Sequence, residues 1–243
     1  MRVSVWHLIK DQALDTQGVA IIQVEWSKPN IPTFASPAKD RLKLLLGRIA
    51  MREFLIIGGL LLGVYVWSGR EISRPAGVLV AEEPVQREVS TTRTAEKAGH
   101  RIAFLASFDV RARVLATERY WFDRGAALAP VDLALGWGAM SNSEVLRQLT
   151  ISQGGRFYNW WAKTLPIARD LIETQSANMH MIPANGDVER RLKGLRAGNL
   201  VRIRGFLVEV TDRNGFRWKS SLTRNDTGGG ACELVWVESL DAW

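Results

Sequence analysis

The sequence predicts an α+β protein, with an N-terminal transmembrane helix followed by a mainly antiparallel, barrel-like β domain that carries inserted short helices. Three observations predict it. One uncharged apolar run covers residues 54–69. Apolar and polar residues alternate with a period of two at 102–121 and 200–210, as in half-buried strands. Helical spacing occurs only in short stretches between these strands.

The apolar run lies between Arg52–Glu53 and Arg70–Glu71. As a helix it would extend about 24 Å, which is short of the roughly 30 Å hydrocarbon core of a bilayer. Flanking arginines could reach the headgroups, and Tyr65 and Trp67 would lie at interface depth. A cleaved signal peptide and a buried helix of a soluble domain are the alternatives. We expect a membrane anchor.

Positive charge predicts the orientation of this segment. Five basic residues precede it between Lys39 and Arg52, and three follow between Arg70 and Arg87, which favours a cytoplasmic N-terminus. The expected order is a cytoplasmic extension or misassigned upstream start (1–50), a transmembrane or signal-anchor helix (51–70), a linker (71–99) and an extracytoplasmic α+β domain (100–243). Met51 is an alternative start, and without residues 1–50 the charge bias is weaker.

The strands of the C-terminal domain favour a barrel. In the stretch 200–210, Gly205 is a candidate bulge or barrel corner. A turn at 212–215 leads to a returning strand at 216–222, and a final strand covers 233–237. Bent antiparallel strands with short helices between them are typical of a small barrel of the oligonucleotide-binding or a similar type.

Three short helices are expected between the strands. Ser141 and Glu144 have the spacing of a capping box before a helix at 145–149. Pro166 opens a second helix that ends before Pro183, and a third covers 188–195. Residues 71–99 contain prolines and polar runs with little apolar periodicity, which predicts the linker.

Composition excludes some classes of protein. With 47% hydrophobic and 23% charged residues, the chain is neither disordered nor polytopic. Cys232 is the only cysteine, which excludes an intrachain disulfide and a cysteine-rich zinc site. We predict no metal and no cofactor. The net charge of +7 permits contact with anionic lipids, wall polymers or nucleic acid without selecting one.

Cys232 and His180 are the candidate catalytic residues. A cysteine nucleophile needs a base, and the glycines at 228–230 could supply N–H groups to an oxyanion. The favoured alternative is structural: Cys232 precedes an apolar strand, where cysteine acts as a small hydrophobe. His180 would satisfy carbonyls at a helix end.

Two polar clusters are candidate binding sites. In the loop 220–230, Arg224 could pair with Asp226 or form an anion site with glycine amides, against a purely structural loop as the alternative. The candidate ligand-binding residues are Ser221, Thr223, Arg224, Asp226 and Gly229. The second cluster is a basic patch, for which a solvated face is the favoured interpretation. Its members are Arg190, Arg191, Lys193, Arg196, Arg202 and Arg204.

Two segments resemble uncharacterised single-pass proteobacterial membrane proteins. They are SANMHMIPA at 176–184 and SSLTRNDTGGGACE at 220–233, and the resemblance extends over residues 104–237. It implies a bacterial envelope setting. From this setting together with the apolar run and the charge bias, we expect a single-pass inner-membrane protein with its C-terminal domain in the periplasm. The resemblance implies no activity and no site residue.

We therefore expect a membrane-anchored binding or assembly module of the bacterial envelope, and not an enzyme. Its expected partners are the inner membrane, other envelope proteins and anionic envelope polymers, without nucleic acid. One alternative is an envelope hydrolase that uses Cys232 with His180. The other is a nucleic-acid-binding barrel domain on the cytoplasmic side.

Overall fold

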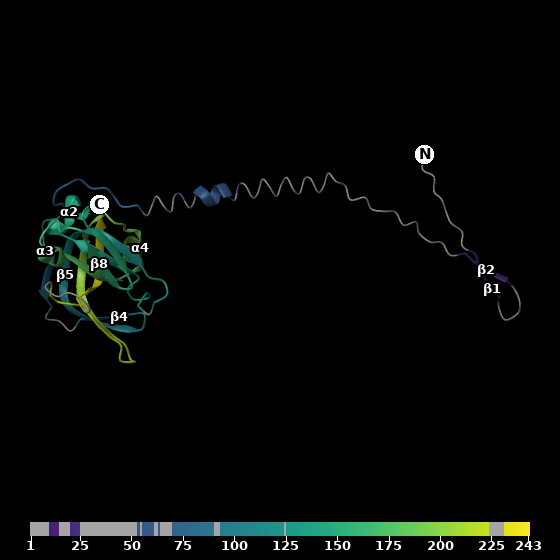
Figure 1. The fold of residues 1–243 in the computed structure, drawn as a ribbon. Helices are drawn as coiled ribbons and strands as arrows, with labels where there is room; N and C mark the ends of the chain where they lie inside the picture. Colours follow the sequence, from purple (N-terminus) through teal and green to yellow (C-terminus); the bar gives the residue numbers. More distant parts are fainter. Residues whose placement is uncertain are drawn as a thin grey trace. The chain divides into compact units, whose positions relative to one another are not determined.

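A computed structural model describes residues 10–14, 20–24, 53, 55–60, 63, 70–89, 93–123, 125–223 and 231–243. The chain divides into two units, residues 1–63 and 64–243. In the first unit, β1 (Lys10–Leu14) and β2 (Ala20–Val24) form an antiparallel hairpin (Figure 1). Residues 53, 55–60 and 63 are helical.

The predicted transmembrane helix at 51–70 falls partly outside the described residues. Where it is described, the side chains of Leu55, Ile56, Ile57 and Leu60 are exposed. No helix in the described part of the chain is long and apolar enough to cross a membrane. The membrane anchor therefore stays a prediction.

The second unit is built around a closed ring of strands (Figure 1). Its members are β5 (His100–Arg119), β6 (Val131–Gly136), β9 (Ser176–Pro183), β10 (Leu200–Thr211) and β12 (Glu233–Ala242). The first three form an antiparallel meander. Then β9 runs parallel to β12, β12 runs antiparallel to β10, and β10 returns antiparallel to β5. The predicted α+β class with a mainly antiparallel sheet is confirmed.

This connectivity resembles that of the oligonucleotide- and oligosaccharide-binding barrel, a five-stranded Greek-key barrel. The helix α4 (Gly186–Gly194) lies between the third and fourth barrel strands. The 20-residue length of β5 allows the ring to close, because residues 101–113 pair with β10 and residues 113–119 pair with β6. The predicted strands at 102–121 and 200–210 are the two that meet at this closure.

The barrel interior is apolar. Alternate residues of the five strands point inward, where Val110, Val114, Leu133, Met181 and Ile203 are all fully buried in one cluster. The predicted irregularity at Gly205 is present as a register shift against β12. A Cβ at this position would lie only 1.8 Å from the Trp236 carbonyl oxygen, so no other residue fits without displacement of the backbone.

Elements outside the ring cover its surface. β3 (Val85–Glu88) and β4 (Thr94–Lys97) pair with β5, and β11 (Arg217–Lys219) pairs antiparallel with the end of β10. β7 (Thr150–Gly154) and β8 (Phe157–Trp161) form a separate hairpin.

Residues 71–99, where a linker is predicted, contain two of these strands and a segment that packs on the barrel. The Ile72 N–H donates to the Ala197 carbonyl at 2.8 Å, and Val80 is buried in the barrel core cluster. These two strands could not be predicted from the sequence, because each has only four residues, too few for a clear alternation of apolar and polar residues.

The helices differ in detail from prediction. Asn142 caps α2 (Ser143–Leu146) by accepting from the Glu144 N–H, while the Ser141 hydroxyl accepts from Val80. A 3₁₀ turn, η1 (Gly138–Ser141), precedes α2. α3 covers only Arg169–Thr174, because the chain enters β9 at Ser176. The prediction of a helix end at His180 is wrong, and that residue lies within β9.

The bulge provides a test of the barrel closure. We expect Gly205→Ala to destabilise the domain by at least about 3 kcal/mol, because the added methyl group overlaps backbone. Urea unfolding would measure the loss. Gly194→Ala is the matched control, since a Cβ there meets nothing within 4 Å. Equal stability of the two variants would contradict the assigned register.

Candidate functional site

The candidate site lies on the outer face of β6 and β9. The inward residues of β6, including Leu133 and Leu135, belong to the barrel core. The outward residue Ala134 is also buried, because it packs in a second cluster beneath η1, α2 and α3. The outward residue Asp132 is fully buried too. A carboxylate there must find partners, since an unpaired buried charge is costly.

Asp132 has two cationic partners. His180 is its direct cross-strand neighbour on β9, and the His180 Nδ1 lies 2.9 Å from the Asp132 Oδ2. These two atoms are off the alignment of an ideal hydrogen bond, so the contact is chiefly electrostatic. The other carboxylate oxygen accepts from the Arg156 Nη1 at 2.9 Å.

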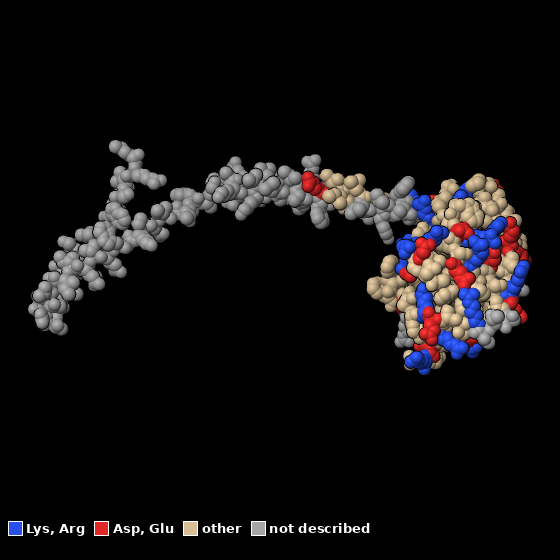
Figure 2. All heavy atoms as spheres, turned by 180° about the vertical axis from the view of Figure 1, so that it is seen from behind, with Lys and Arg blue, Asp and Glu red and all other residues tan. Residues whose placement is uncertain are grey.

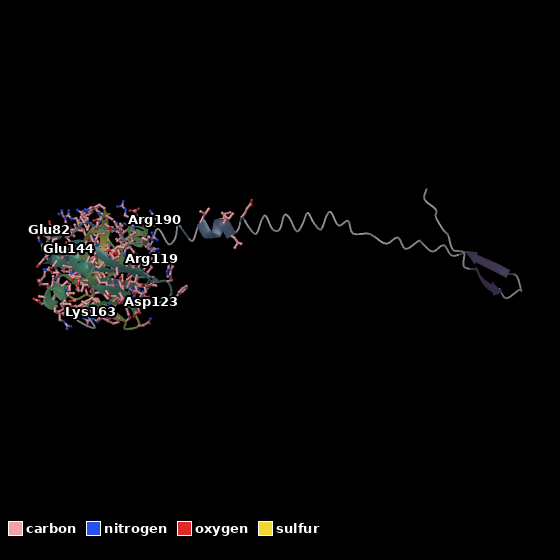
Figure 3. All side chains as sticks on the ribbon, turned by 45° about the horizontal axis from the view of Figure 1, so that its top comes forward. Glu82, Arg119, Asp123, Glu144, Lys163 and Arg190 are labelled. Atoms are coloured by element: carbon pink, nitrogen blue, oxygen red, sulfur yellow. The ribbon has the colours of Figure 1, made fainter. Side chains whose placement is uncertain are left out.

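Arg156 is held in place by the loop between β5 and β6. It occupies the turn of the β7–β8 hairpin with a φ of 72°. Its guanidinium lies 3.6 Å from the centroid of the Tyr120 ring and pairs with Asp123 at 2.8 Å. Asp123 lies at the edge of the barrel, near Arg119 (Figure 3). Hydrogen bonding from Arg156 lowers the pKa of Asp123, and burial raises the pKa of Tyr120 to about 12.

The thiol of Cys232 contacts the opposite side of this network. The thiol also acts on the His180 imidazole, whose pKa it raises together with Asp132. It also accepts from the Asn178 Nδ2 at 3.5 Å. Cys232 is partly exposed, whereas His180 and Asp132 are buried. The three residues therefore form a chain from the surface inward: thiol, imidazole, carboxylate.

The pKa of His180 is raised to about 9. Burial acts to lower it, but the interactions of the imidazole with Asp132 and Cys232 outweigh burial. The Trp218 ring packs against the imidazole with 4.8 Å between ring centroids, and it limits the access of water. At neutral pH the imidazole is therefore mainly protonated.

Cys232 opens into a cleft of about 270 Å³ between β8, the start of β9 and the start of β12. Four aromatic residues line it, together with carboxylate, amide and hydroxyl side chains. The aromatic members are Trp137, Phe157, Tyr158 and Trp160, and the polar members include Asn159, Glu173, Ser176, Asn178, Thr223 and Glu233. The reactive group thus lies at the wall of a space that can hold a ligand.

The predicted ligand loop is described only at its ends. Ser221 and Thr223 form a local turn, in which the Ser221 hydroxyl donates to the Thr223 carbonyl and accepts from the Thr223 N–H. The Ser221 N–H donates to the Cys232 carbonyl, which ties the two ends together. The candidates Arg224, Asp226 and Gly229 lie outside the described residues, as do the glycines considered for an oxyanion site.

The predicted basic patch is paired with carboxylates. Figure 2 shows Lys and Arg side by side with Asp and Glu over one face of the barrel. The ion pairs of the patch are Arg190–Asp187, Arg191–Asp187, Lys193–Glu189, Arg202–Asp109 and Arg204–Asp241. The sixth member, Arg196, lies between α4 and β10 and also has an interaction partner. The patch is therefore weakly suited to a polyanion.

Three residues of the site were missed in the sequence: Asp132, Arg156 and Asn178. Asp132 could have been found, since it is the one charged residue in the run Val131–Gly136, which is otherwise apolar or glycine, and such a pattern indicates a buried carboxylate. Arg156 follows Gly154–Gly155, a pair that indicates a turn and gives no sign of a site. Nothing in the sequence joins these positions to Cys232, because the barrel pairings bring them together.

Comparison with known proteins gives no match: no family model, curated protein or solved structure is found to be similar to the chain. The resemblance to proteobacterial single-pass membrane proteins stays a prediction. Among the described residues, no group of three or more His, Cys, Asp or Glu side chains is placed to hold a metal ion. The site is thus defined by its geometry alone, as a thiol, an imidazole and a carboxylate on the outer face of a small barrel.

The raised pKa of His180 predicts a pH-dependent stability. The folded pKa of about 9 exceeds the ordinary 6.5, so the stabilisation is complete below about pH 6.5 and is lost as the pH rises through 9. The full effect is on the order of 3 kcal/mol. We expect the stability difference between the wild type and His180→Gln to shrink over this range, measured by urea unfolding. A pH-independent difference would contradict the assignment, and His100→Gln, at a half-buried histidine outside this network, is the control.

Proposed function

We propose that the chain is a thiol-dependent hydrolase that cleaves an amide or ester bond, with Cys232 as the nucleophile. The observation that carries the proposal is the chain of contacts from Cys232 through His180 to Asp132 at the wall of a cleft. A nucleophile beside a base that a third group orients is the general arrangement of covalent acyl transfer.

The proposed reaction has two steps. The Cys232 thiolate attacks the substrate carbonyl carbon, and the leaving amine or alcohol takes a proton from the His180 imidazolium as its bond breaks. This leaves a thioester on Cys232 and a neutral imidazole. Water then attacks the thioester while His180 accepts its proton, which releases the acid and restores the thiolate–imidazolium pair.

Asp132 and Arg156 have positioning roles. The carboxylate of Asp132 holds the His180 ring through Nδ1 and favours its protonated form. Arg156 fixes Asp132 from the other side and is itself held by Asp123 and by the Ala129 carbonyl. Asp132 and Arg156 therefore hold the imidazole near the thiol, and neither of them needs to contact the substrate.

A binding module is the second candidate, and it is the function that the sequence favours. The cleft borders β9, the third barrel strand. In oligonucleotide- and oligosaccharide-binding barrels, the face formed by the second and third strands binds the ligand. The row of Cys232, His180 and Asp132 favours the hydrolase over the binding module, because a ligand-binding face does not require such a row. The ion-paired basic patch gives the nucleic-acid alternative little support.

Membrane anchoring belongs to the proposal as well. The apolar run at 54–69 and the excess of positive charge before it support a single-pass inner-membrane protein with the barrel domain in the periplasm. Envelope proteins and anionic envelope polymers are then the expected partners, and no cofactor is required by the proposed reaction.

An activated ester tests the thiol. We expect 4-nitrophenyl acetate to acetylate Cys232, seen as a burst of nitrophenolate and a mass increase of one acetyl group. Cys232→Ala should abolish the burst. His180→Gln should slow acetylation by roughly 10²-fold or more, because the imidazolium beside the thiol is lost. Acetylation of the folded wild type no faster than of the urea-unfolded chain would exclude the proposed hydrolase.

A reporter fusion tests the orientation. Alkaline phosphatase fused after Trp243 should be active, because that enzyme matures only outside the cytoplasm, and a cytoplasmic reporter at the same site should be silent. Fusions that start at Met1 and at Met51 should give the same result if residues 1–50 only reinforce the orientation. Activity of the cytoplasmic reporter alone would place the domain on the opposite side.

A further inference from the structure

We propose that the substrate of the cleft is an extended peptide segment, which pairs with the open edge of β8 as an added strand and passes Cys232. The inference rests on the proposed function and names its substrate class. Addition of a strand to an exposed sheet edge is a common mode of peptide recognition, in which main-chain hydrogen bonds supply the affinity.

The register of the hairpin defines the open edge. Gly155 and Arg156 both have a positive φ and form a two-residue turn, so Gly154 and Phe157 are a hydrogen-bonded pair. Hydrogen-bonded pairs alternate along an antiparallel ladder. Tyr158 and Trp160 therefore point their backbone N–H and C=O groups away from β7.

These outward groups have no partner strand. β8 pairs only with β7 among the described strands, and no described residue hydrogen-bonds the backbone of Tyr158 or Trp160 across the open edge. Unpaired edge groups of this kind form a template for another chain. Two residues with outward groups can make up to four hydrogen bonds with one extended peptide.

The open edge lies along the cleft of Cys232. Tyr158 and Trp160 line this cleft, and they also line a second hollow that continues past Trp161 and Leu165. Phe157 and Trp161 are exposed, with 53% and 64% of their surface accessible, and they lie on one face of the strand. An added strand would therefore run over a continuous surface that contains apolar contacts for its side chains.

The charge of the cleft selects among peptides. Its described lining residues include the carboxylates of Glu173 and Glu233 and no lysine or arginine, whereas Arg169 lines the second hollow. Glu233 is buried and has an interaction partner of its own, so Glu173 is the carboxylate that faces a ligand. Glu173 is partly neutralised by Arg169, whose Nε lies 2.8 Å from its Oε1. A neutral or basic peptide fits this lining, and an acidic peptide or a phosphate-bearing polymer does not.

The test uses Cys232, the single cysteine of the full chain, as the site of capture. The probe is chloroacetyl-Val-Lys-Val-Lys-Val-amide, which alkylates a thiol next to which it binds. We expect it to react at least about tenfold faster than chloroacetamide, measured by mass spectrometry, because binding raises the local concentration. The acidic counterpart with Glu in place of Lys should lose most of this acceleration.

Backbone methylation distinguishes strand addition from other binding. In an added strand, alternate N–H groups point to β8. Methylation of either the Val or the Lys nitrogens should therefore abolish the acceleration, while methylation of the other set leaves it. If both sets are tolerated, the cleft does not bind a strand, and an oligosaccharide or a purely apolar ligand is favoured. No acceleration for the unmodified peptide also overturns the inference.

Protein variants complete the test. Glu173→Gln should reduce the preference for the Lys peptide over the Glu peptide, and Glu83→Gln, at an exposed carboxylate away from the cleft, should not. The ratio of peptide to chloroacetamide rates cancels the intrinsic reactivity of the thiol. If Cys232 is acetylated slowly but the peptide still alkylates it faster than chloroacetamide does, the hydrolase proposal fails and the peptide site stands. If acetylation is fast but the two alkylation rates are equal, the peptide site fails and the hydrolase proposal stands.

Discussion

The buried carboxylate of Asp132 is the constraint on which the site depends. A lone charge in this position would cost several kcal/mol, and the domain tolerates it because two cations face it from different segments of the chain. Arg156 arrives from the β7–β8 turn and His180 from the neighbouring barrel strand. Loss of either cation would leave the buried carboxylate with a single charged partner, which is unfavourable. The carboxylate therefore fixes the hairpin on the barrel and holds the imidazole near the thiol.

The closure of the barrel brings these residues together from distant parts of the chain. Asp132 and His180 meet because β6 pairs with β9, and Cys232 joins them because β12 runs parallel to β9 on its other side. That parallel contact requires the fifth strand to enter the ring beside the third, which the connectivity of this barrel provides. Cys232, the proposed nucleophile, therefore lies just before the start of a strand, where its side chain can reach the cleft.

Much of the barrel could be predicted from the sequence, and little of the site. The strands β5 and β10 alternate over many residues, and Gly205 was identified as a bulge, because these features are local. β9 was missed, since both of its faces are buried and it lacks alternation. This error placed His180 at a helix end and removed it from Cys232. The partners Asp132 and Arg156 could not be predicted, because their roles depend on pairings between strands that are far apart in the chain.

The β7–β8 hairpin is an insertion between the second and third strands of the barrel. It contacts the catalytic candidates through Arg156, whose guanidinium donates to Asp132 and whose carbonyl oxygen lies 4.0 Å from the Cys232 Sγ. Its strand β8, which lines the cleft, contributes no residue to the ring. In the proposed function, recognition and chemistry are therefore carried by separable pieces of the chain. Sequence change in β8 could retune which segment is accepted while the thiol, imidazole and carboxylate keep their places, so that one scaffold could serve a range of targets.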